Sequence, residues 1–246
     1  MSSRFAFALV ALSLAGCTPK TPLHVLGAQS LESAFQAAGH AYDDAHKDTR
    51  VDTSFAGSQI LVTQVEQGAP ADVIATADTK TMDDLVQKHL VDAPVLFAHN
   101  KLVVVVPAKN PAHITSITDI SKPGIKLVLA GEKVPAGNYA RTALRALGID
   151  HDALKNVVSN EDSVAGVMTK VSLGEADAGI AYATDVKASG GKTIAWPFPP
   201  GVDVSVAYPI AVTSSSQHKA EAAAFIAFVS SGPGADALRA AGFSVP

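Results

Sequence analysis

The chain has 246 residues, of which 48% are hydrophobic and 17% charged, and its formal net charge is −4. This length suffices for one large domain or two smaller lobes, and the composition excludes an intrinsically disordered chain. Acidic and basic residues are interspersed without a basic stripe, so we expect no nucleic-acid binding. A single cysteine, Cys17, excludes a disulfide framework within the chain and a cysteine metal site.

The N-terminus has the features of a bacterial export signal. A positive charge precedes a short apolar run at residues 5–14, which is too short for a stable membrane-spanning helix. The segment Leu14-Ala15-Gly16-Cys17 resembles the bacterial lipobox, in which cleavage leaves the cysteine as the lipid-modified first residue. We therefore expect residues 1–16 to be a signal peptide, Cys17 to be lipidated and residues 17–22 to tether an extracytoplasmic body to a membrane. The alternative is an ordinary secretory signal that happens to contain a cysteine.

Apolar periodicity predicts strands alternating with helices along the rest of the chain. In chain order we predict a strand at residues 23–26, a helix at 30–46, a strand at 50–55, a helix at 58–67, a strand at 72–75, a helix at 78–88, a strand at 102–107, a short helix at 117–120, a strand at 125–130, helices at 138–147 and 163–173, strands at 178–181 and 204–212, and a helix at 220–229. This alternation indicates an α/β architecture, whose ligands lie beyond the carboxyl ends of the strands.

One local pattern recurs at four places, where small residues join the end of a strand to the beginning of a helix. The four junctions are residues 26–30, 55–58, 134–137 and 160–164. A helix N-terminus presents free N–H groups and a partial positive charge, so each junction is a potential anion-binding corner. Because no catalytic motif accompanies them, the four corners favour capture of a small anion over chemistry on it.

Several segments resemble the periplasmic molybdate-binding proteins of ABC importers, in the same order and with similar spacing. They are Gly27-Ala28-Gln29-Ser30-Leu31, Ser54-Phe55-Ala56-Gly57-Ser58, Gly68-Ala69-Pro70-Ala71-Asp72-Val73 with Ala77-Asp78, Val134-Pro135-Ala136-Gly137-Asn138-Tyr139-Ala140, Glu161-Asp162 before Val164, and Gly179-Ile180-Ala181-Tyr182. The resemblance spans nearly everything from Leu23 to Phe243. It implies an α/β, two-lobed periplasmic solute-binding fold of type II, in which each lobe is a mostly parallel sheet flanked by helices. The implied lobes are residues 23–100 plus 208–246 and residues 101–207, with the ligand in the cleft between them.

The same resemblance implies the ligand and the groups that contact it. The expected contacts are the hydroxyls of Ser30, Ser58 and Tyr182 and the backbone N–H groups of Ala136 and Val164. The expected ligand is molybdate or tungstate, with no cofactor and no residue acting as a direct metal-cation ligand. The expected partners are an ABC permease with its cytoplasmic ATPase, and the protein is expected to be a monomer and not an enzyme.

Two positions depart from the pattern of that family. Gln29 stands where a small residue is usual, and Gln59 stands where a hydroxyl residue is frequent. Either amide could add a contact, narrow the pocket or point to solvent. Asp72 and Asp78 are predicted to be turn and cap residues rather than ligands.

Molybdate and tungstate are tetrahedral dianions at neutral pH, so their site needs hydrogen-bond donors only. The absence of Asp and Glu from the expected contacts disfavours protonated phosphate. Sulfate or another tetrahedral oxyanion remains an alternative, because only pocket size separates sulfate from molybdate.

Two other classes of function remain open. A secreted hydrolase could use Ser30 or Ser58 as nucleophile, although neither G-x-S-x-G nor S-x-x-K surrounds these serines. A sensory role would need a membrane partner. Each serine, taken alone, could also be no more than the N-cap of its own helix.

Overall fold

The computed structural model describes residues 20–246. The expected signal peptide and the lipidated Cys17 lie outside these described residues. Residues 21 and 22, which were expected to belong to the tether, begin the first strand instead. They pair with residues 49 and 50. Between residues 20 and 246, no helix combines the length and the apolar character needed to cross a membrane.

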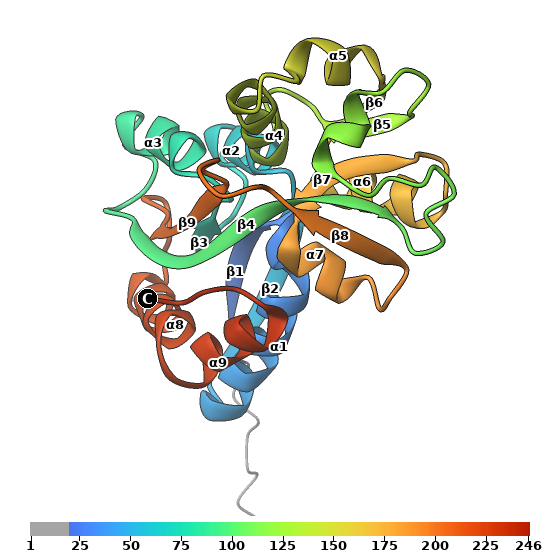
Figure 1. The fold of residues 1–246 in the computed structure, drawn as a ribbon. Coiled ribbons are helices and arrows are strands. Elements are labelled where there is room, and N and C mark those ends of the chain that lie inside the picture. The colour runs from blue at the N-terminus through green and yellow to red at the C-terminus, as the bar shows by residue number, and fades with distance from the viewer. Residues whose placement is uncertain (1–19) are drawn as a thin grey trace, which may run out of the picture.

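The described chain alternates strands and helices over most of its length (Figure 1). The strands are β1 (Thr21–Ala28), β2 (Thr49–Ala56), β3 (Val73–Ala75), β4 (Val95–Pro107), β5 (Leu127–Ala130), β6 (Val157–Glu161), β7 (Ala178–Tyr182), β8 (Thr193–Pro197) and β9 (Ser205–Val212). The α-helices are α1 (Glu32–Ala45), α2 (Ser58–Glu66), α3 (Thr79–Gln87), α4 (Pro135–Ala146), α5 (Asp150–Lys155), α6 (Val164–Ser172), α7 (Ala183–Ala188), α8 (Lys219–Ser230) and α9 (Gly232–Ala241), and the 3₁₀ helices are η1 (Gln29–Leu31) and η2 (Ile117–Ser121).

The strands join in the order β2-β1-β3-β9-β4-β7-β5-β6, and β8 pairs with β4. Three parallel strands lie at each end of this series, β2-β1-β3 and β7-β5-β6. Antiparallel pairing is confined to contacts made by β4 and β9. The fold is therefore the predicted α/β class, built on a mixed sheet.

Strand β4 connects the two halves of the molecule. Its residues up to Lys101 pair with β9, whereas Leu102–Val105 pair with β7 and Val103–Pro107 pair with β8. We call β1, β2 and β3 with α1–α3, α8 and α9 the first lobe, and β5–β8 with α4–α7 the second lobe, while β4 and β9 pass between them. In Figure 1, β4 runs from first-lobe elements at the left to second-lobe elements at the right.

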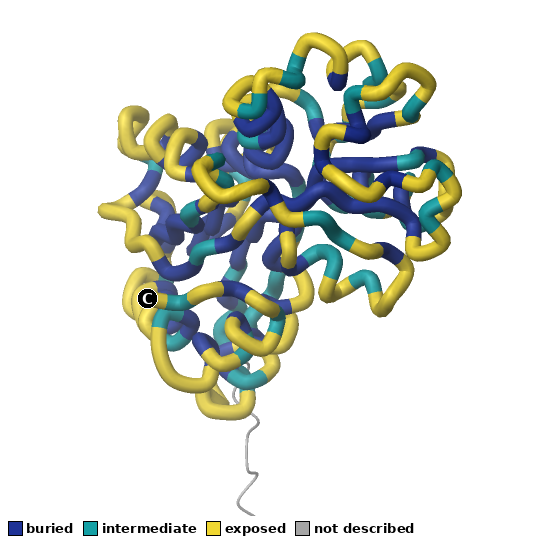
Figure 2. Tube along the Cα trace, in the orientation of Figure 1, coloured by how far each residue is buried: buried dark blue, intermediate teal, exposed yellow. Residues whose placement is uncertain are grey.

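The first-lobe sheet is covered on both faces because its strands alternate in the direction of their side chains. Val25 packs in the cluster that contains side chains of α1, α8 and α9, while its neighbour Leu26 packs in the cluster formed with α2 and α3. The former cluster continues along the valines of β4 into the second lobe. Figure 2 shows this buried path running along the central strands between the exposed helix surfaces.

Every predicted strand and helix is present, with shifted ends. The largest shifts are in β4, which begins at Val95 instead of Leu102, and in α4, which begins at Pro135 instead of Asn138. Five elements were not predicted as such, namely α5, β6, α7, β8 and α9.

Candidate functional site

The four predicted corners converge on one cavity between the lobes. The carboxyl ends of β1, β2 and β3 lead to one side of it, and those of β5, β6 and β7 lead to the other. All five residues expected to contact an oxyanion line this cavity, namely Ser30, Ser58, Ala136, Val164 and Tyr182. Tertiary structure thus brings together residues that are spread over more than half of the chain.

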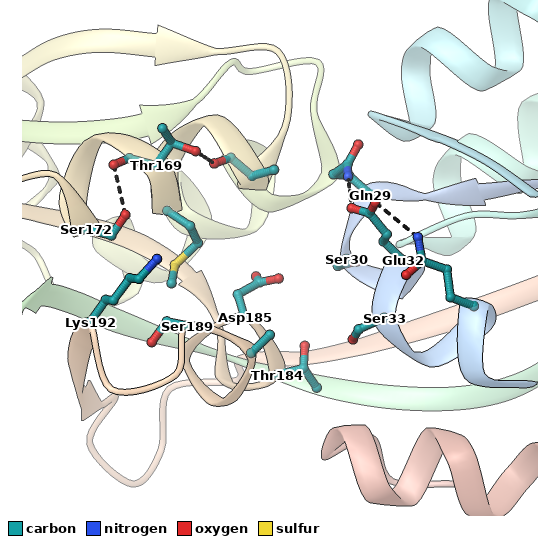
Figure 3. Close-up of a pocket in the computed structure, with 14 residues that line it drawn as sticks. Gln29, Ser30, Glu32, Ser33, Thr169, Ser172, Thr184, Asp185, Ser189 and Lys192 are labelled. Atoms are coloured by element: carbon teal, nitrogen blue, oxygen red, sulfur yellow. Dashed lines mark hydrogen bonds between the residues drawn. The ribbon is translucent and has the colours of Figure 1, made fainter.

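The cavity is small and carries no charged side chain among its described lining residues. Its volume is about 10 Å³ for the centre of a water-sized sphere, close to what one such sphere requires. In this conformation it therefore has room for about one water-sized group. A second, larger cavity, an open groove of about 380 Å³, lies between η1 and α1 of the first lobe and α6 and α7 of the second (Figure 3).

Ser58 begins α2 but does not cap it. Its side chain is 1% exposed, and its Oγ accepts a hydrogen bond of 3.0 Å from the backbone N–H of Ala77. Because an oxygen that accepts from Ala77 still carries its own proton, the Ser58 hydroxyl can donate to an anion in the cavity. The interpretation of Ser58 as a mere N-cap is therefore wrong.

Ser30 is oriented by a chain of buried polar groups at the junction of the lobes. Its Oγ lies 2.9 Å from the hydroxyl oxygen of Tyr208 in β9. Asn100 in β4 accepts from the backbone N–H of Lys101 at 2.9 Å, which leaves its amide group to donate to Tyr208 at 3.5 Å. Tyr208 can then donate to Ser30, an arrangement that leaves the Ser30 proton for the cavity.

The second lobe offers backbone amides at the beginnings of α4 and α6. The first N–H groups of any helix, here including those of Ala136 and Val164, lack an intrahelical partner. Neither α4 nor α6 has a side-chain N-cap that would accept from them. Helix α4 can begin this close to β5 because residue 137 is glycine. A Cβ there would collide with the carbonyl oxygens of Ala130 and Gly131.

Arg141 connects the second-lobe corners through hydrogen bonds. Its guanidinium is buried and donates to the carbonyl oxygens of Ala130 at 2.8 Å and Gly137 at 3.0 Å, and to the side-chain oxygen of Asn160 at 2.6 Å. These three acceptors lie at the end of β5, the first turn of α4 and β6. Burial lowers the pKa of Arg141 from its ordinary value. The guanidinium group donates to these three acceptors, and Arg141 is not among the residues that line the cavity.

Tyr182, at the end of β7, has a hydroxyl that is buried and lacks a hydrogen-bond partner among the described residues. Its side chain is 1% exposed and lines the cavity. Burial, and to a lesser extent the charges of Tyr208, Asp185 and Asp78, raise the pKa of this hydroxyl well above its ordinary value. The group therefore stays protonated and is a donor. A buried polar group without a partner is costly, which favours a ligand that accepts from it.

Asp185 is an acidic residue that contacts the backbone of Tyr182. Its Oδ2 accepts from the backbone N–H of Tyr182 at 3.0 Å, and its carboxylate borders the larger groove, where Figure 3 labels it opposite Ser30. Burial raises the pKa of Asp185 to about 7.

The geometry gives no support to a serine hydrolase. Among the described residues, the hydroxyl of Ser30 hydrogen-bonds only to Tyr208, and that of Ser58 only to the Ala77 amide. Neither contact supplies the base that a serine nucleophile needs. Asp72 and Asp78 have the structural roles predicted, since Asp78 caps α3 through Thr81 and Asp72 accepts from the backbone of His24.

Sequence reasoning did not identify Asn100, Tyr208 or Arg141 as part of the site. Asn100 lies between His99 and Lys101 in β4 and Tyr208 lies in the largely apolar β9, and neither position indicates a hydrogen-bond partner in sequence. Of the two departures from the family pattern, Gln29 donates to Glu32 of its own lobe at 2.7 Å, whereas Gln59 donates to the carbonyl oxygen of Asp162 in the second lobe at 2.9 Å.

Comparison with known proteins gives consistent results. The family model of bacterial extracellular solute-binding proteins matches residues 23–244. The molybdate-binding protein ModA of Mycobacterium tuberculosis H37Rv is 38% identical over 223 residues, which cover 90% of this chain and 84% of that protein.

Two solved structures share the fold. The periplasmic molybdate-binding protein of Azotobacter vinelandii matches with a TM-score of 0.81 at 20% identity, covering 91% of this chain and 99% of that one. The sulfate-binding protein SubI of Mycobacterium tuberculosis matches with a TM-score of 0.76 at 20% identity, covering 92% and 87%. At these identities the two structures establish the fold and leave the choice of anion to the site.

Proposed function

This chain belongs to the family of bacterial extracellular solute-binding proteins, and we propose that it captures molybdate between its two lobes and delivers it to an ABC importer. The identity to a molybdate-binding protein over most of both chains supports this choice of ligand. The proposed role is that of a binding protein and not of an enzyme, and it requires no cofactor.

The observation that carries the proposal is the buried hydroxyl of Tyr182, which has no partner within residues 20–246 and lines a cavity to which those residues contribute no charged side chain. A bare tetrahedral dianion accepts hydrogen bonds and donates none, so this surrounding matches it. The proposed contacts are the hydroxyls of Ser30, Ser58 and Tyr182 and the backbone N–H groups of Ala136 and Val164. Each such bond to a charged acceptor contributes about 1.5–3 kcal/mol net.

The proposed domain organisation follows from the change of partner along β4. We place the lobe boundaries near Asn100–Lys101 and Ala207–Tyr208, so that the first lobe comprises residues 23–100 and 208–246 and the second lobe residues 101–207. The paired strands β4 and β9 pass between the lobes close to these positions. Since both lobes contribute donors, the anion stabilises the closed arrangement over an open one.

Tungstate has the same charge and tetrahedral shape as molybdate, and we propose that it binds too. Sulfate also shares these features but is smaller, so it would leave longer hydrogen bonds in a site sized for molybdate. The fold shared with a sulfate-binding protein keeps sulfate as the second candidate.

Isothermal titration of the chain without residues 1–17 tests the proposed function. Molybdate and tungstate should each bind tightly with one-to-one stoichiometry, and sulfate and phosphate much more weakly. Equal affinity for sulfate would change the assignment to a broader oxyanion carrier. No binding of any of the four anions would refute the carrier assignment.

We also propose that Cys17 is lipid-modified after removal of residues 1–16, so that a monomeric body stays near the permease and its ATPase. The lipobox-like segment supports the anchor. Replacing Cys17 with alanine should release the protein from the membrane fraction of cells without changing its affinity for molybdate. Membrane fractionation that is the same for both forms would contradict lipidation.

A further inference from the structure

One hydrogen bond crosses the cleft directly beside the anion cavity. The side-chain Nε2 of Gln59 donates to the backbone carbonyl oxygen of Asp162 at 2.9 Å. Gln59 follows Ser58 in the first turn of α2, and Asp162 precedes Val164 at the beginning of α6. The bond therefore joins a donor corner of the first lobe to a donor corner of the second.

Other side-chain bonds between the lobes lie elsewhere. Among the described residues, Asn100 donates to Thr184 at 2.8 Å beside β4, and Lys187 donates to the carbonyl oxygen of Ala240 in α9 at 2.6 Å. Neither Lys187 nor Ala240 lines the anion cavity. In the groove of Figure 3, the dashed hydrogen bonds link residues within the same lobe. Of these bonds, the one between Gln59 and Asp162 is the one that crosses the cleft beside the cavity.

The backbones of the two lobes also come very close at this point. A Cβ atom on Gly57 would lie nearer to the carbonyl oxygen of Asp162 than real Cβ atoms approach any neighbour. Gly57 has φ −59° and ψ 138°, a conformation that alanine adopts without strain. In this arrangement a side chain at Gly57 is excluded by the Asp162 carbonyl oxygen of the second lobe and by the Gln59 amide that bonds to it, and not by the backbone conformation of the turn.

The orientation of the Gln59 amide follows from the same contact. Rotating the amide by half a turn would place its oxygen against the Asp162 carbonyl oxygen, which is repulsive. In the observed orientation, Oε1 is buried and has no partner among the described residues. The side chain is therefore held by its bond to Asp162 and by no second hydrogen bond.

We propose that Gln59 is a positioning residue that latches the two lobes together beside the bound oxyanion and so slows its release. This inference rests on the proposed function, because a latch matters only if an anion is held in the cleft. The latch cannot form when the lobes are apart, so it acts on dissociation and leaves the encounter with the anion unchanged.

The test is stopped-flow and calorimetric measurement of molybdate binding to the full chain and its variants. Gln59→Ala should raise the dissociation rate about 3–10-fold, the effect of one neutral hydrogen bond, with the association rate unchanged. Gln59→Glu should raise it further, because a carboxylate would face both the Asp162 carbonyl oxygen and the anion. Gly57→Ala should weaken binding by about tenfold or more, because its methyl group keeps the lobes apart.

Gln64→Ala is the matched control, since Gln64 is an exposed residue of the same helix. It should bind with wild-type rates, and all four variants should melt within a few degrees of the wild type in the absence of molybdate. A wild-type dissociation rate in Gln59→Ala would overturn the latch while leaving the proposed function intact. An equal acceleration in Gln64→Ala would overturn it too, by assigning the effect to α2 as a whole. Failure of the wild type to bind molybdate would overturn the proposed function and the latch with it.

Discussion

The two sides of the anion cavity present donors of different kinds. The first lobe contributes the side-chain hydroxyls of Ser30 and Ser58, each fixed by a hydrogen bond to a specific partner. The second lobe contributes the backbone amides of two uncapped helix beginnings, together with the hydroxyl of Tyr182.

This difference determines how each side can be altered. A serine hydroxyl is removed by one substitution to alanine, and its partner then loses a hydrogen bond as well. A backbone amide survives almost any substitution, because every residue except proline carries it. The second lobe thus holds two of its donors through the path of the main chain and one through Tyr182, whereas the first lobe relies on the identity of two residues.

The largest effect is expected for Ser58→Ala. It should reduce molybdate affinity by about 1.5–3 kcal/mol, the contribution of a hydrogen bond to a charged group. The buried Ala77 amide would also lose its acceptor, which should lower the free energy of unfolding by about 1–3 kcal/mol. Calorimetry and denaturant unfolding measure the two effects, with Ser54→Ala, an exposed serine of β2, as the control. Unchanged affinity would show that Ser58 does not contact the anion.

On the second-lobe side, Val164→Pro should lower affinity by about 1.5–3 kcal/mol. Proline lacks the N–H group but suits the first position of a helix, and the preceding Ser163 has the extended conformation that proline requires. Val164→Ala truncates the side chain and keeps the amide, so it should bind almost normally. Calorimetric affinities that fall equally in both variants would indicate that packing matters here and the amide does not.

A smaller effect is expected for Tyr208→Phe, which tests whether Ser30 needs its oriented partner. The Ser30 hydroxyl would remain but would be free to rotate, and Asn100 would lose one acceptor. Affinity should fall by about 0.5–1.5 kcal/mol, less than in Ser30→Ala. The two variants and the double variant form a cycle that measures the coupling. Strictly additive losses would argue against the chain of donors from Asn100 to Ser30.

The smallest effect concerns pH and Asp185. Burial raises the pKa of Asp185 to about 7 in the folded protein, whereas an unfolded aspartate titrates near about 4. Between these values the unfolded chain is ionised at this position and the folded one is protonated. The contribution of this group to stability therefore falls as pH rises from about 4 to about 7, and changes no further above that.

Above pH 7 the ionised Asp185 also repels a dianion held by Tyr182. Wild-type affinity for molybdate should therefore fall a few-fold between pH 6 and pH 8. Asp185→Asn keeps an acceptor for the Tyr182 amide and should flatten both this profile and the pH dependence of the melting temperature. Parallel pH profiles of the two proteins would show that another group titrates.

Predictability also differs between parts of the chain. The long amphipathic elements and the valine run of β4 were predicted because their periodicity reports burial locally. Helices α5 and α7 have six residues each, too few to show a period. Strand β8 exists through its antiparallel pairing with β4, and α9 begins at Gly232-Pro233-Gly234, a run more typical of a turn.

The sequence by itself determined the α/β class, the order of most elements and the four corners, because small residues between a strand and a helix are recognisable locally as potential anion-binding termini. Only the tertiary structure decided which groups act together. Ser30 meets Tyr208 across 178 residues and Gln59 meets Asp162 across 103. Such contacts depend on how the chain folds around β4 and β9. No local pattern of residues encodes a contact between residues so far apart in the sequence. The direction in which each hydroxyl donates follows from these long-range partners, and with it the preference for a bare anion.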